Sequence, residues 1–349
     1  MNPVLHSKPW ITDADLGAIR SVLLGGMIAQ GQVVAEFERE IGNWVNSEPG
    51  VAVGSGSSAI VLSLMGLGVT SGDEVIVPTY VCKSVAEAVC AVGAVPVFCD
   101  VGEQWVIEPA NAQRVKTTRT KAVIVPHMYG VYADVAAFLP LGISVIEDCA
   151  QAVGHRGERR VAGHAAIFSF HPTKCLTTGE GGMAVANDRD LVARMRAIRD
   201  GRQNGIVGRL ISPMPDTSAA LGRSQLARYE QALTRRVEIA GSYVKVVQRV
   251  RPDSLPRTAL KNTMHFRFPL QLEGGLDACG FGFTKKGITV RRGVDRLLHR
   301  LAGLADDGFG TAVRHFGNTI SVPIYPALTA EETDRCVDAM KAVFLPVTA

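Results

Sequence analysis

Short apolar runs alternate with amphipathic stretches through the first half of the chain. The apolar runs are VAV at 51–53, DEVIVP at 73–78, AVPVFCDV at 94–101, KAVIVPHM at 121–128 and ISVIED at 143–148. Helical patterns separate them, starting near residues 57 and 81, covering 109–117, and forming a short helix near 134. Nearly continuous apolar runs with short connections predict βαβ units and a mostly parallel sheet covered by helices on both faces.

The second half begins with the same alternation of apolar and amphipathic stretches, and the pattern then changes. We expect strands at 165–170 and 181–188, a helix over 189–199, an irregular stretch from 201 to 216, and a long connecting helix over 218–250. Further strands are expected at 266–272, 288–292 and 320–325, and Thr329 with Glu332 forms a capping box before a final helix. The pattern predicts an α/β protein with a large domain, residues 1–250, and a smaller C-terminal α+β domain, residues 251–349.

Composition excludes several classes of protein. The chain has 349 residues, of which 47% are hydrophobic and 20% charged, as in an ordinary globular protein. The net charge of +4 comes from mixed signs, with no basic run interleaved with aromatics, so we expect no nucleic-acid partner. One arginine cluster fits either phosphate groups or a solvated helix face: Arg194, Arg196, Arg199, Arg202 and Arg209.

The number and spacing of the cysteines and the sequence of the N-terminus indicate the cellular compartment. The seven cysteines are odd in number and widely spread, with no C-x-x-C pair, which favours a reduced cytoplasm over disulfides and gives no metal site. The first ten residues contain no apolar signal segment. Residues 49–72 carry no charge, but their apolar part, 59–69, is too short to span a membrane and is predicted to be a buried helix.

A lysine follows the strand expected at 165–170. Lys174 lies between that strand and a glycine-rich loop, where open α/β sheets hold their ligands. A partly desolvated lysine at such a place loses its proton readily and acts as a nucleophile. A solvated loop lysine is the alternative that position alone leaves open.

A glycine and serine turn follows the first strand. Gly54-Ser55-Gly56-Ser57-Ser58 leads directly into a helix, where free backbone N–H groups and the helix dipole favour a phosphate. The turn has neither the Walker A pattern nor G-x-G-x-x-G, which disfavours ATP and dinucleotides. A simple helix entry remains the alternative.

Two further strands end in polar residues. Glu147 and Asp148 end one buried strand, where a carboxylate is costly unless it meets a cation. His127 and Tyr129 follow another, and each also fits a hydrogen-bonded core position. Together with Lys174 and the turn, these segments offer a phosphate site, a carboxylate for a ring nitrogen and an amine for a Schiff base. Those are the requirements of pyridoxal 5′-phosphate.

Spaced motifs in this order resemble those of the DegT-type nucleotide-sugar aminotransferases, which are fold-type-I enzymes. The motifs are GSGSSA, GDEVIVPTYV, VPHMYG, IEDCAQAVG, FSFHPTK, GEGG, AALGRSQL and SVPIYPALTAEE. The resemblance extends from about residue 28 to near the C-terminus. It implies transfer of an amino group from an amino acid, glutamate, to a keto group of a nucleotide-linked sugar. It also implies a homodimer with the active site at the subunit interface.

The resemblance assigns roles residue by residue. It implies that Lys174 bonds to the cofactor aldehyde and moves protons, that Asp148 partners the pyridine nitrogen, and that Gln151 lies beside the ring hydroxyl. The residues implied as phosphate ligands are Gly56, Ser57, Ser58 and Ser169. Those expected around the substrate are His127, Tyr129, Trp10 and Arg292.

The chain departs from the family pattern at two places. Cys82 stands where an aromatic residue usually stacks on the cofactor ring, and Ile211-Ser212-Pro213 replaces a run whose asparagine reaches the partner subunit's cofactor phosphate. Two alternatives therefore stay open. One is another pyridoxal-phosphate reaction, such as dehydration, decarboxylation or desulfuration, and the other is a regulatory relative without turnover.

Overall fold

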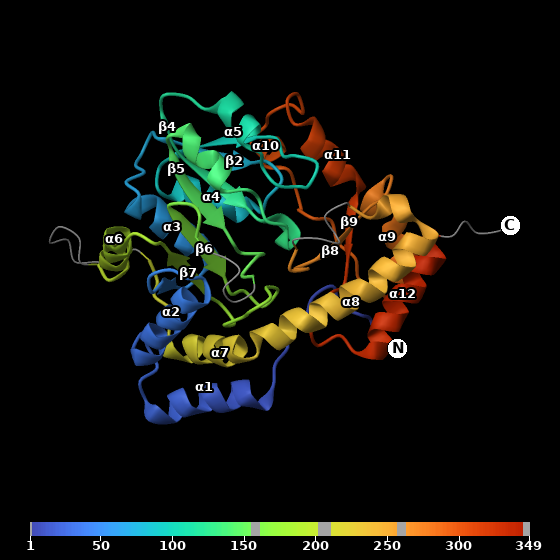
Figure 1. The fold of residues 1–349 in the computed structure, drawn as a ribbon, viewed down its shortest axis with the longest axis horizontal. Coiled ribbons are helices and arrows are strands. Elements are labelled where there is room, and N and C mark those ends of the chain that lie inside the picture. The colour runs from blue at the N-terminus through green and yellow to red at the C-terminus, as the bar shows by residue number, and fades with distance from the viewer. Residues whose placement is uncertain (1, 155–160, 202–210, 257–262, 345–349) are drawn as a thin grey trace.

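A seven-stranded sheet forms the centre of the molecule (Figure 1). The computed structural model describes residues 2–154, 161–201, 211–256 and 263–344. The strands are β1 (Val51–Val53), β2 (Glu74–Pro78), β3 (Val95–Cys99), β4 (Thr120–Pro126), β5 (Ser144–Asp148), β6 (Ala165–Ser169) and β7 (Gly182–Val185). Their order is β1-β7-β6-β5-β4-β2-β3, and only β7 runs antiparallel to its neighbours. The predicted mostly parallel sheet is confirmed.

Helices cover both faces of this sheet. One core includes residues of α3 (Gly56–Gly66), α4 (Lys83–Ala91), α5 (Pro109–Val115) and α6 (Arg189–Arg199), and a second includes residues of α2 (Gln32–Trp44) and α7 (Asp216–Ala227). Residues of β1 show the alternation, since Val51 and Val53 belong to the first core and Ala52 to the second. The short helix expected near 134 is a 3₁₀ helix, η2 (Ala136–Leu141).

The N-terminal helices were not predicted from the pattern. Helix α1 (Asp13–Gly25) packs along α7 on the outside of the molecule (Figure 1), and it exposes Leu16, Leu23 and Leu24. An outer face rich in leucine hides the contrast of polar and apolar faces that identifies a surface helix. The single helix expected over 218–250 is divided at Arg228 into α7 and α8 (Tyr229–Val250).

Helix α8 leads away from the large sheet to a second group of elements (Figure 1). Strands β8 (Phe268–Gln271) and β9 (Thr319–Val322) pair antiparallel, and α9 (Gly275–Lys285) and α12 (Ala330–Phe344) share a core with α8. Shorter helices, α10 (Leu298–Leu301) and α11 (Gly310–Asn318), connect them. The capping box of α12 is confirmed, because Thr329 Oγ1 accepts from the Glu332 amide at 3.1 Å and Glu332 Oε2 accepts from the Thr329 amide at 3.0 Å.

The strand expected at 288–292 is wrong. Ile288 and Arg291 make only isolated bridges, to Val4 and Ser321, because the segment contacts a different neighbour at each end. Gly287, with φ +71°, turns the chain immediately before it. Through Val4 the N-terminal segment packs into the same core as β8 and β9. The domain boundary at residue 250 stays a prediction.

The uncharged segment at 49–72 and the arginine cluster have structural explanations. Residues 56–66 form α3, whose inward side chains are buried, and within the described ranges no helix is long and apolar enough to cross a membrane. Arg196 and Arg199 on α6 both pair with Glu38 of α2. Arg194 donates to the carbonyl of Gly66, whereas Arg202 and Arg209 lie outside the described residues.

Candidate active site

The predicted site residues gather where parallel strands end. Asp148 is the last residue of β5 and Ser169 the last of β6, and Asp148 is in register with Pro126 at the end of β4. Because the carboxyl ends of parallel strands meet at one edge of a sheet, residues far apart in the sequence come together there. The glycine and serine turn after β1 reaches the same edge, since Gly182 of β7 pairs both with Val53 and with Ser169.

The turn between β1 and α3 is fixed by two glycines. A Cβ on Gly182 would lie 2.2 Å from the Ser55 carbonyl oxygen, and a Cβ on Gly56 would lie 2.7 Å from Cβ of Ser169. Ser55 caps α3 by accepting from the Ser58 amide at 3.1 Å and, through its carbonyl, from the Ala59 amide at 3.1 Å. The amides of Gly56 and Ser57 are then the donors that the first helical turn offers to an anion.

The segment that departs from the family pattern lies beside this turn. The Gly54 amide donates to the Ser212 carbonyl at 2.8 Å, and Pro213 bridges to Val53. Ile211 is buried in the core under α3 and α6. Residues 211–213 therefore support the cradle from the same chain, through main-chain contacts and an apolar side chain.

Asp148 is a buried carboxylate with few neighbouring groups that offset its negative charge. Its Oδ1 accepts from the Ala150 amide at 2.9 Å, and its main-chain carbonyl accepts from the His127 amide at 3.1 Å. Among the residues that the structure describes, no ion pair includes it. Burial raises the pKa of Asp148, against the opposing effects of the Ala150 amide and the positive charge of Lys174. Such a carboxylate is stabilised by a positively charged ligand atom.

Lys174 lies in a loop that Phe170 closes. The Phe170 amide donates to the Gly181 carbonyl, and the Phe170 carbonyl accepts from the Thr178 amide, both at 2.9 Å. The Lys174 side chain keeps partial contact with solvent, but it is surrounded closely enough that desolvation lowers its pKa, which the charge of Asp148 opposes. Its Nζ is 5.4 Å from the centroid of the Phe266 ring. The neutral, nucleophilic form of the amine is therefore easier to reach than in a solvated lysine.

Gln151 and Tyr129 are joined beside these two groups. The Tyr129 amide donates to Gln151 Oε1 at 2.8 Å, and the Tyr129 hydroxyl bonds that of Tyr80 at 2.8 Å. Tyr129 has φ +59°, a left-handed conformation that is costly for a bulky residue. Burial raises the pKa of both tyrosines, that of Tyr80 to about 12. Both hydroxyls therefore stay protonated at neutral pH.

The expectation that His127 lines the same pocket is wrong, because its ring lies with Glu147. Nε2 of His127 is 3.4 Å from Glu147 Oε2, and its Nδ1 accepts from the Ala133 amide at 3.0 Å. Those two atoms and the sulfur of Cys149 lie within 4.8 Å of one another. Because the Ala133 amide donates to Nδ1, a neutral His127 ring carries its proton on Nε2, which faces Glu147.

The other residues expected near the cofactor or substrate have separate surroundings. Trp10 lines a pocket with Lys174, which Lys8, Gln225 and Arg228 also enclose. Cys82 is exposed at the N-cap of α4 and interacts electrostatically with Lys174. Arg292 is already engaged, since it pairs with Asp277 and lies 4.8 Å above the Phe316 ring.

Arg267 was missed by the sequence reasoning. It lies immediately before β8, and its Nη1 donates to the main-chain carbonyls of Arg292 at 3.1 Å and Gly293 at 3.2 Å. In the run FRFPLQL an arginine between two phenylalanines matches the polar position of an alternating strand. The sequence carries no signal that this polar position faces Lys174.

Comparison with known proteins gives consistent results. The model of the DegT/DnrJ/EryC1/StrS aminotransferase family matches residues 9–341. The erythromycin biosynthesis sensory transduction protein EryC1 of Saccharopolyspora erythraea is 34% identical, over 93% of this chain and 94% of that protein. GDP-perosamine synthase of Caulobacter vibrioides is 31% identical, over 90% and 91%. The crystal structure of the aminotransferase TlmJ from Streptoalloteichus hindustanus superposes with a TM-score of 0.88 at 27% identity, covering 99% of both chains.

Proposed function

The chain belongs to the DegT/DnrJ/EryC1/StrS aminotransferase family, and on that premise we propose that it moves an amino group from glutamate to a keto group of a nucleotide-linked sugar. The observation that carries the proposal is the placement of a partly exposed Lys174 and a buried Asp148, each of which acts on the charge of the other, beside the glycine cradle. A nucleotide-linked acceptor is supported by the GDP-perosamine synthase relative.

Pyridoxal 5′-phosphate is the cofactor of this family, and the residues of this chain fit it. The cradle at Gly56 and Ser169 has no room for a Cβ and offers amides to a phosphate, with the hydroxyls of Ser57 and Ser58 nearby. Asp148 lacks the cation that a protonated ring nitrogen would supply. Gln151, whose Oε1 fixes the Tyr129 amide, is assigned to the ring hydroxyl.

Two side chains perform the proton chemistry. When bound, the cofactor supplies an aldehyde that receives the amino group and a protonated ring that takes up electrons. The lowered pKa of Lys174 favours the neutral form that the amine needs to bond to that aldehyde, and later to take a proton from the substrate Cα. A positive charge on the ring nitrogen would favour the ionised form of Asp148, which would then hold the proton there.

The two departures from the family pattern, at Cys82 and at residues 211–213, change how the cofactor is held rather than the reaction that it supports. At Cys82 we propose that a sulfur takes the place of the stacking aromatic, which weakens cofactor binding without removing Lys174. At residues 211–213 we propose that the main-chain bonds to Gly54 and Val53 replace the partner-subunit asparagine as support for the phosphate turn.

We also propose a homodimer in the cytoplasm. The exposed leucines of α1 and the neighbouring Met27 and Ile28 form an apolar surface that a second copy would cover. All seven cysteines are free, as a reducing compartment requires. Light scattering after gel filtration tests the dimer, and a mass equal to one chain contradicts it.

The experiment for the proposed function needs no sugar. Purified protein is incubated with pyridoxal phosphate and its absorbance spectrum is recorded, and glutamate is then added to the wild type and to Lys174→Ala. We expect the lysine-bound band to form only in the wild type and to change to the pyridoxamine spectrum with glutamate. The two open alternatives predict other results. A band that glutamate leaves unchanged favours another reaction of the same cofactor, and the absence of any band favours a regulatory relative.

A further inference from the structure

A pocket at the junction of α7 and α8 collects buried polar atoms that have no hydrogen-bond partner. In the described part of the chain, four buried side-chain nitrogen or oxygen atoms lack a partner, and three of them belong to residues of this pocket: Arg228 Nε, Tyr229 Oη and Arg236 Nε. We call it the junction pocket, and Lys8 and Lys174 also line it. Because buried polar atoms are nearly always satisfied, this concentration points to a ligand that accepts hydrogen bonds.

The junction pocket is also positively charged. None of the described residues that line it is acidic, whereas two lysines and two arginines do so. Arg228 pairs with Asp15 of α1. Within the described ranges no carboxylate forms an ion pair with Lys8, Lys174 or Arg236. Enclosed cations without counter-charges are stabilised by an anion that reaches their free N–H groups.

Two of the unpartnered donors are buried and fixed in place. Arg236 is 3% exposed, and its Nη1 donates to three main-chain carbonyls at distances from 2.9 to 3.2 Å, while its Nε has no acceptor. Tyr229 is 1% exposed. Burial raises the pKa of Tyr229, and the neighbouring Cys175 adds to the effect, so the hydroxyl stays protonated and able to donate. A thiol such as that of Cys175 is only a weak hydrogen-bond partner.

The junction pocket is separate from the cofactor side of Lys174. Of the residues assigned to the cofactor, only Lys174 also lines this pocket. Tyr229 belongs to the core that includes α2 and α7, whereas Asp148 is in register with Ile167, which belongs to the other core. A ligand in the junction pocket therefore approaches Lys174 without occupying the place of the cofactor.

An inorganic anion fits the junction pocket better than water or a nucleotide. Water can satisfy the free donors, but it does not offset the charge of the unpaired cations. Trp10 and Tyr229 are the aromatic residues that line the pocket, and Arg228 lies against the Trp10 ring, with its Cζ 5.3 Å from the centroid. That face of Trp10 is not open for a base to stack on. Phosphate is compact, multiply charged and able to accept through every oxygen.

We propose that the junction pocket binds free inorganic phosphate, and that the bound phosphate slows the reaction at Lys174. The binding site is independent of the proposed function, whereas the effect on the rate rests on it. A negative charge beside an amine favours the protonated amine. A protonated Lys174 can neither bond to an aldehyde nor take a proton from the substrate.

The first measurement is binding by calorimetry. Potassium phosphate is titrated into cofactor-loaded protein, so that the glycine cradle is already filled, and potassium chloride of equal ionic strength is the blank. Tyr229→Phe removes one free donor and no charge, so we expect it to weaken phosphate binding by about tenfold, the effect of one hydrogen bond to a charged group. Arg236→Lys keeps the charge but removes Nε, and it should give a loss of similar size. Lys8→Gln, at an exposed position, should give about threefold.

Thermal unfolding separates a ligand site from a packing role. Without phosphate, Tyr229→Phe should be at least as stable as the wild type, because it removes a buried hydroxyl that has no partner. With saturating phosphate the wild type should become the more stable of the two, since it binds the ligand more tightly. A tyrosine that only packs against its neighbours would not reverse the order.

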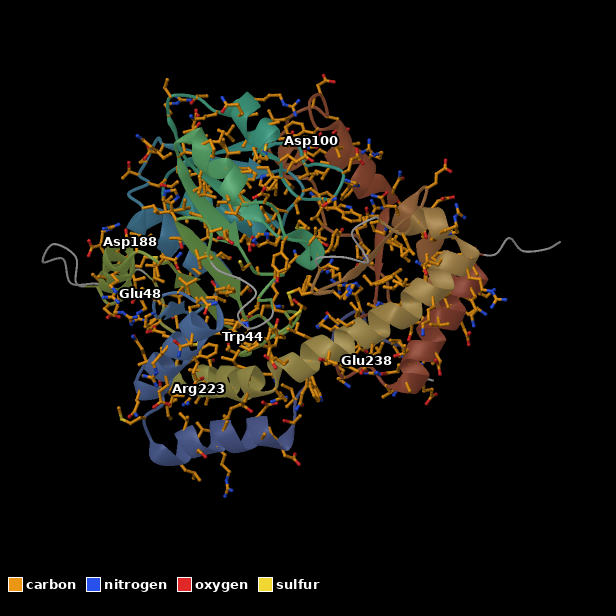
Figure 2. All side chains as sticks on the ribbon, viewed as in Figure 1. Trp44, Glu48, Asp100, Asp188, Arg223 and Glu238 are labelled. Atoms are coloured by element: carbon orange, nitrogen blue, oxygen red, sulfur yellow. The ribbon has the colours of Figure 1, made fainter. Side chains whose placement is uncertain are left out.

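The effect on the reaction is measured in single turnovers with glutamate. The wild-type rate should fall as phosphate is added, and the half-inhibiting concentration should rise by about tenfold in Tyr229→Phe, whose rate without phosphate should equal that of the wild type. Arg189→Gln is the matched control for the loss of a cation. It removes an exposed arginine whose partner, Glu48, lies beside α6 and far from the junction of α7 and α8 (Figure 2), so it should bind phosphate like the wild type.

Three results overturn the proposal in whole or in part. Phosphate affinity that is absent in the wild type, or unchanged in both Tyr229→Phe and Arg236→Lys, would mean that only water fills the pocket. Displacement of phosphate by glutarate, a dicarboxylate that cannot react, would assign the pocket to the amino-acid donor. Binding without any change in rate would remove the inhibition and keep the site. The proposed function fails separately, if glutamate does not convert the wild-type cofactor spectrum in the absence of phosphate.

Discussion

Two adjacent carboxylates of β5, Glu147 and Asp148, have opposite surroundings. Their register partners on β6, Ala166 and Ile167, belong to different cores, so the two side chains lie on opposite faces of the sheet. Oε1 of Glu147 accepts from the amides of Ala162 and Gly163, and its Oε2 faces His127. Asp148 accepts from one amide, that of Ala150, and the charge of Lys174 acts on it without an ion pair among the described residues.

The difference shows how a structural polar cluster is told apart from a site. A buried carboxylate whose oxygens are all satisfied stabilises the fold and has no capacity left for a ligand. A buried carboxylate whose pKa is raised, because too few donors and positive charges surround it, lowers the stability of the fold. Such a carboxylate is expected where a bound ligand supplies the missing positive charge. The following changes break or sharpen this contrast, from the largest expected effect to the smallest.

Loss of Lys174 should remove the function of the Asp148 face altogether. Lys174→Met keeps the length of the side chain but has neither the nucleophile nor the proton carrier. General acid–base catalysis alone contributes about 10²–10⁴-fold, so we expect glutamate conversion to fall by at least about 10³-fold. Stopped-flow absorbance of the cofactor measures the rate. A rate within tenfold of wild type would contradict the role of Lys174.

Asp148→Asn should slow the same reaction while keeping the shape of the site. An asparagine cannot compensate a protonated ring nitrogen, and removing one preorganised electrostatic group costs about 10²–10³-fold. The half-reaction with glutamate should therefore slow by about that factor, with the fold unchanged by circular dichroism. Wild-type rates in this variant would mean that another group holds the ring proton.

Glu147→Gln should lower the stability of the fold and leave the rate of the reaction nearly unchanged. The substitution puts an amide N–H where an acceptor oxygen now lies among buried donors, which costs about 1–3 kcal/mol. We expect the free energy of unfolding in urea to fall by that amount. The rate with glutamate, per folded molecule, should stay within about threefold of wild type. A stable but inactive variant would move the site to the Glu147 face.

The pH dependence of stability gives the smallest effect. The pKa of Asp148 is raised above 3.8 in the folded protein, so between the unfolded and folded pKa values the native state binds more protons. The stability contribution of this carboxyl is therefore lost as pH rises through its folded pKa. In cofactor-free protein, Asp148→Asn should gain stability relative to wild type as the pH rises above about 4. A constant difference in urea unfolding would show that the pKa is not raised.

Much of the fold and of the site follows from local sequence patterns. The strands of the large sheet are uninterrupted apolar runs, and the glycine and serine turn, Asp148 and Lys174 each follow one of them. Because the carboxyl ends of parallel strands meet at one edge, chain order alone predicts that these groups assemble. Helix α1 escaped prediction because its exposed leucines remove its polar face.

The missed and mistaken residues depend on contacts that a single sequence does not carry. His127 was expected near the cofactor, but its ring turns to Glu147, because the bond from the Ala133 amide fixes its orientation. Arg267 and Lys174 share a neighbour, because the Phe266 ring lies near both of them. Such placements are decided by packing between distant segments, which hydrophobic periodicity does not encode.

The central claim is that Asp148, on one face of β5, serves the reaction, whereas Glu147, on the other face, stabilises the fold. One paired measurement tests this claim most directly. The rate of cofactor conversion by glutamate is recorded for Asp148→Asn and Glu147→Gln, both loaded with pyridoxal phosphate and both checked for the folded fraction. The account predicts a loss of about 10²–10³-fold for Asp148→Asn and a near wild-type rate for Glu147→Gln. Equal losses in the two variants, or a larger loss for Glu147→Gln, would contradict it.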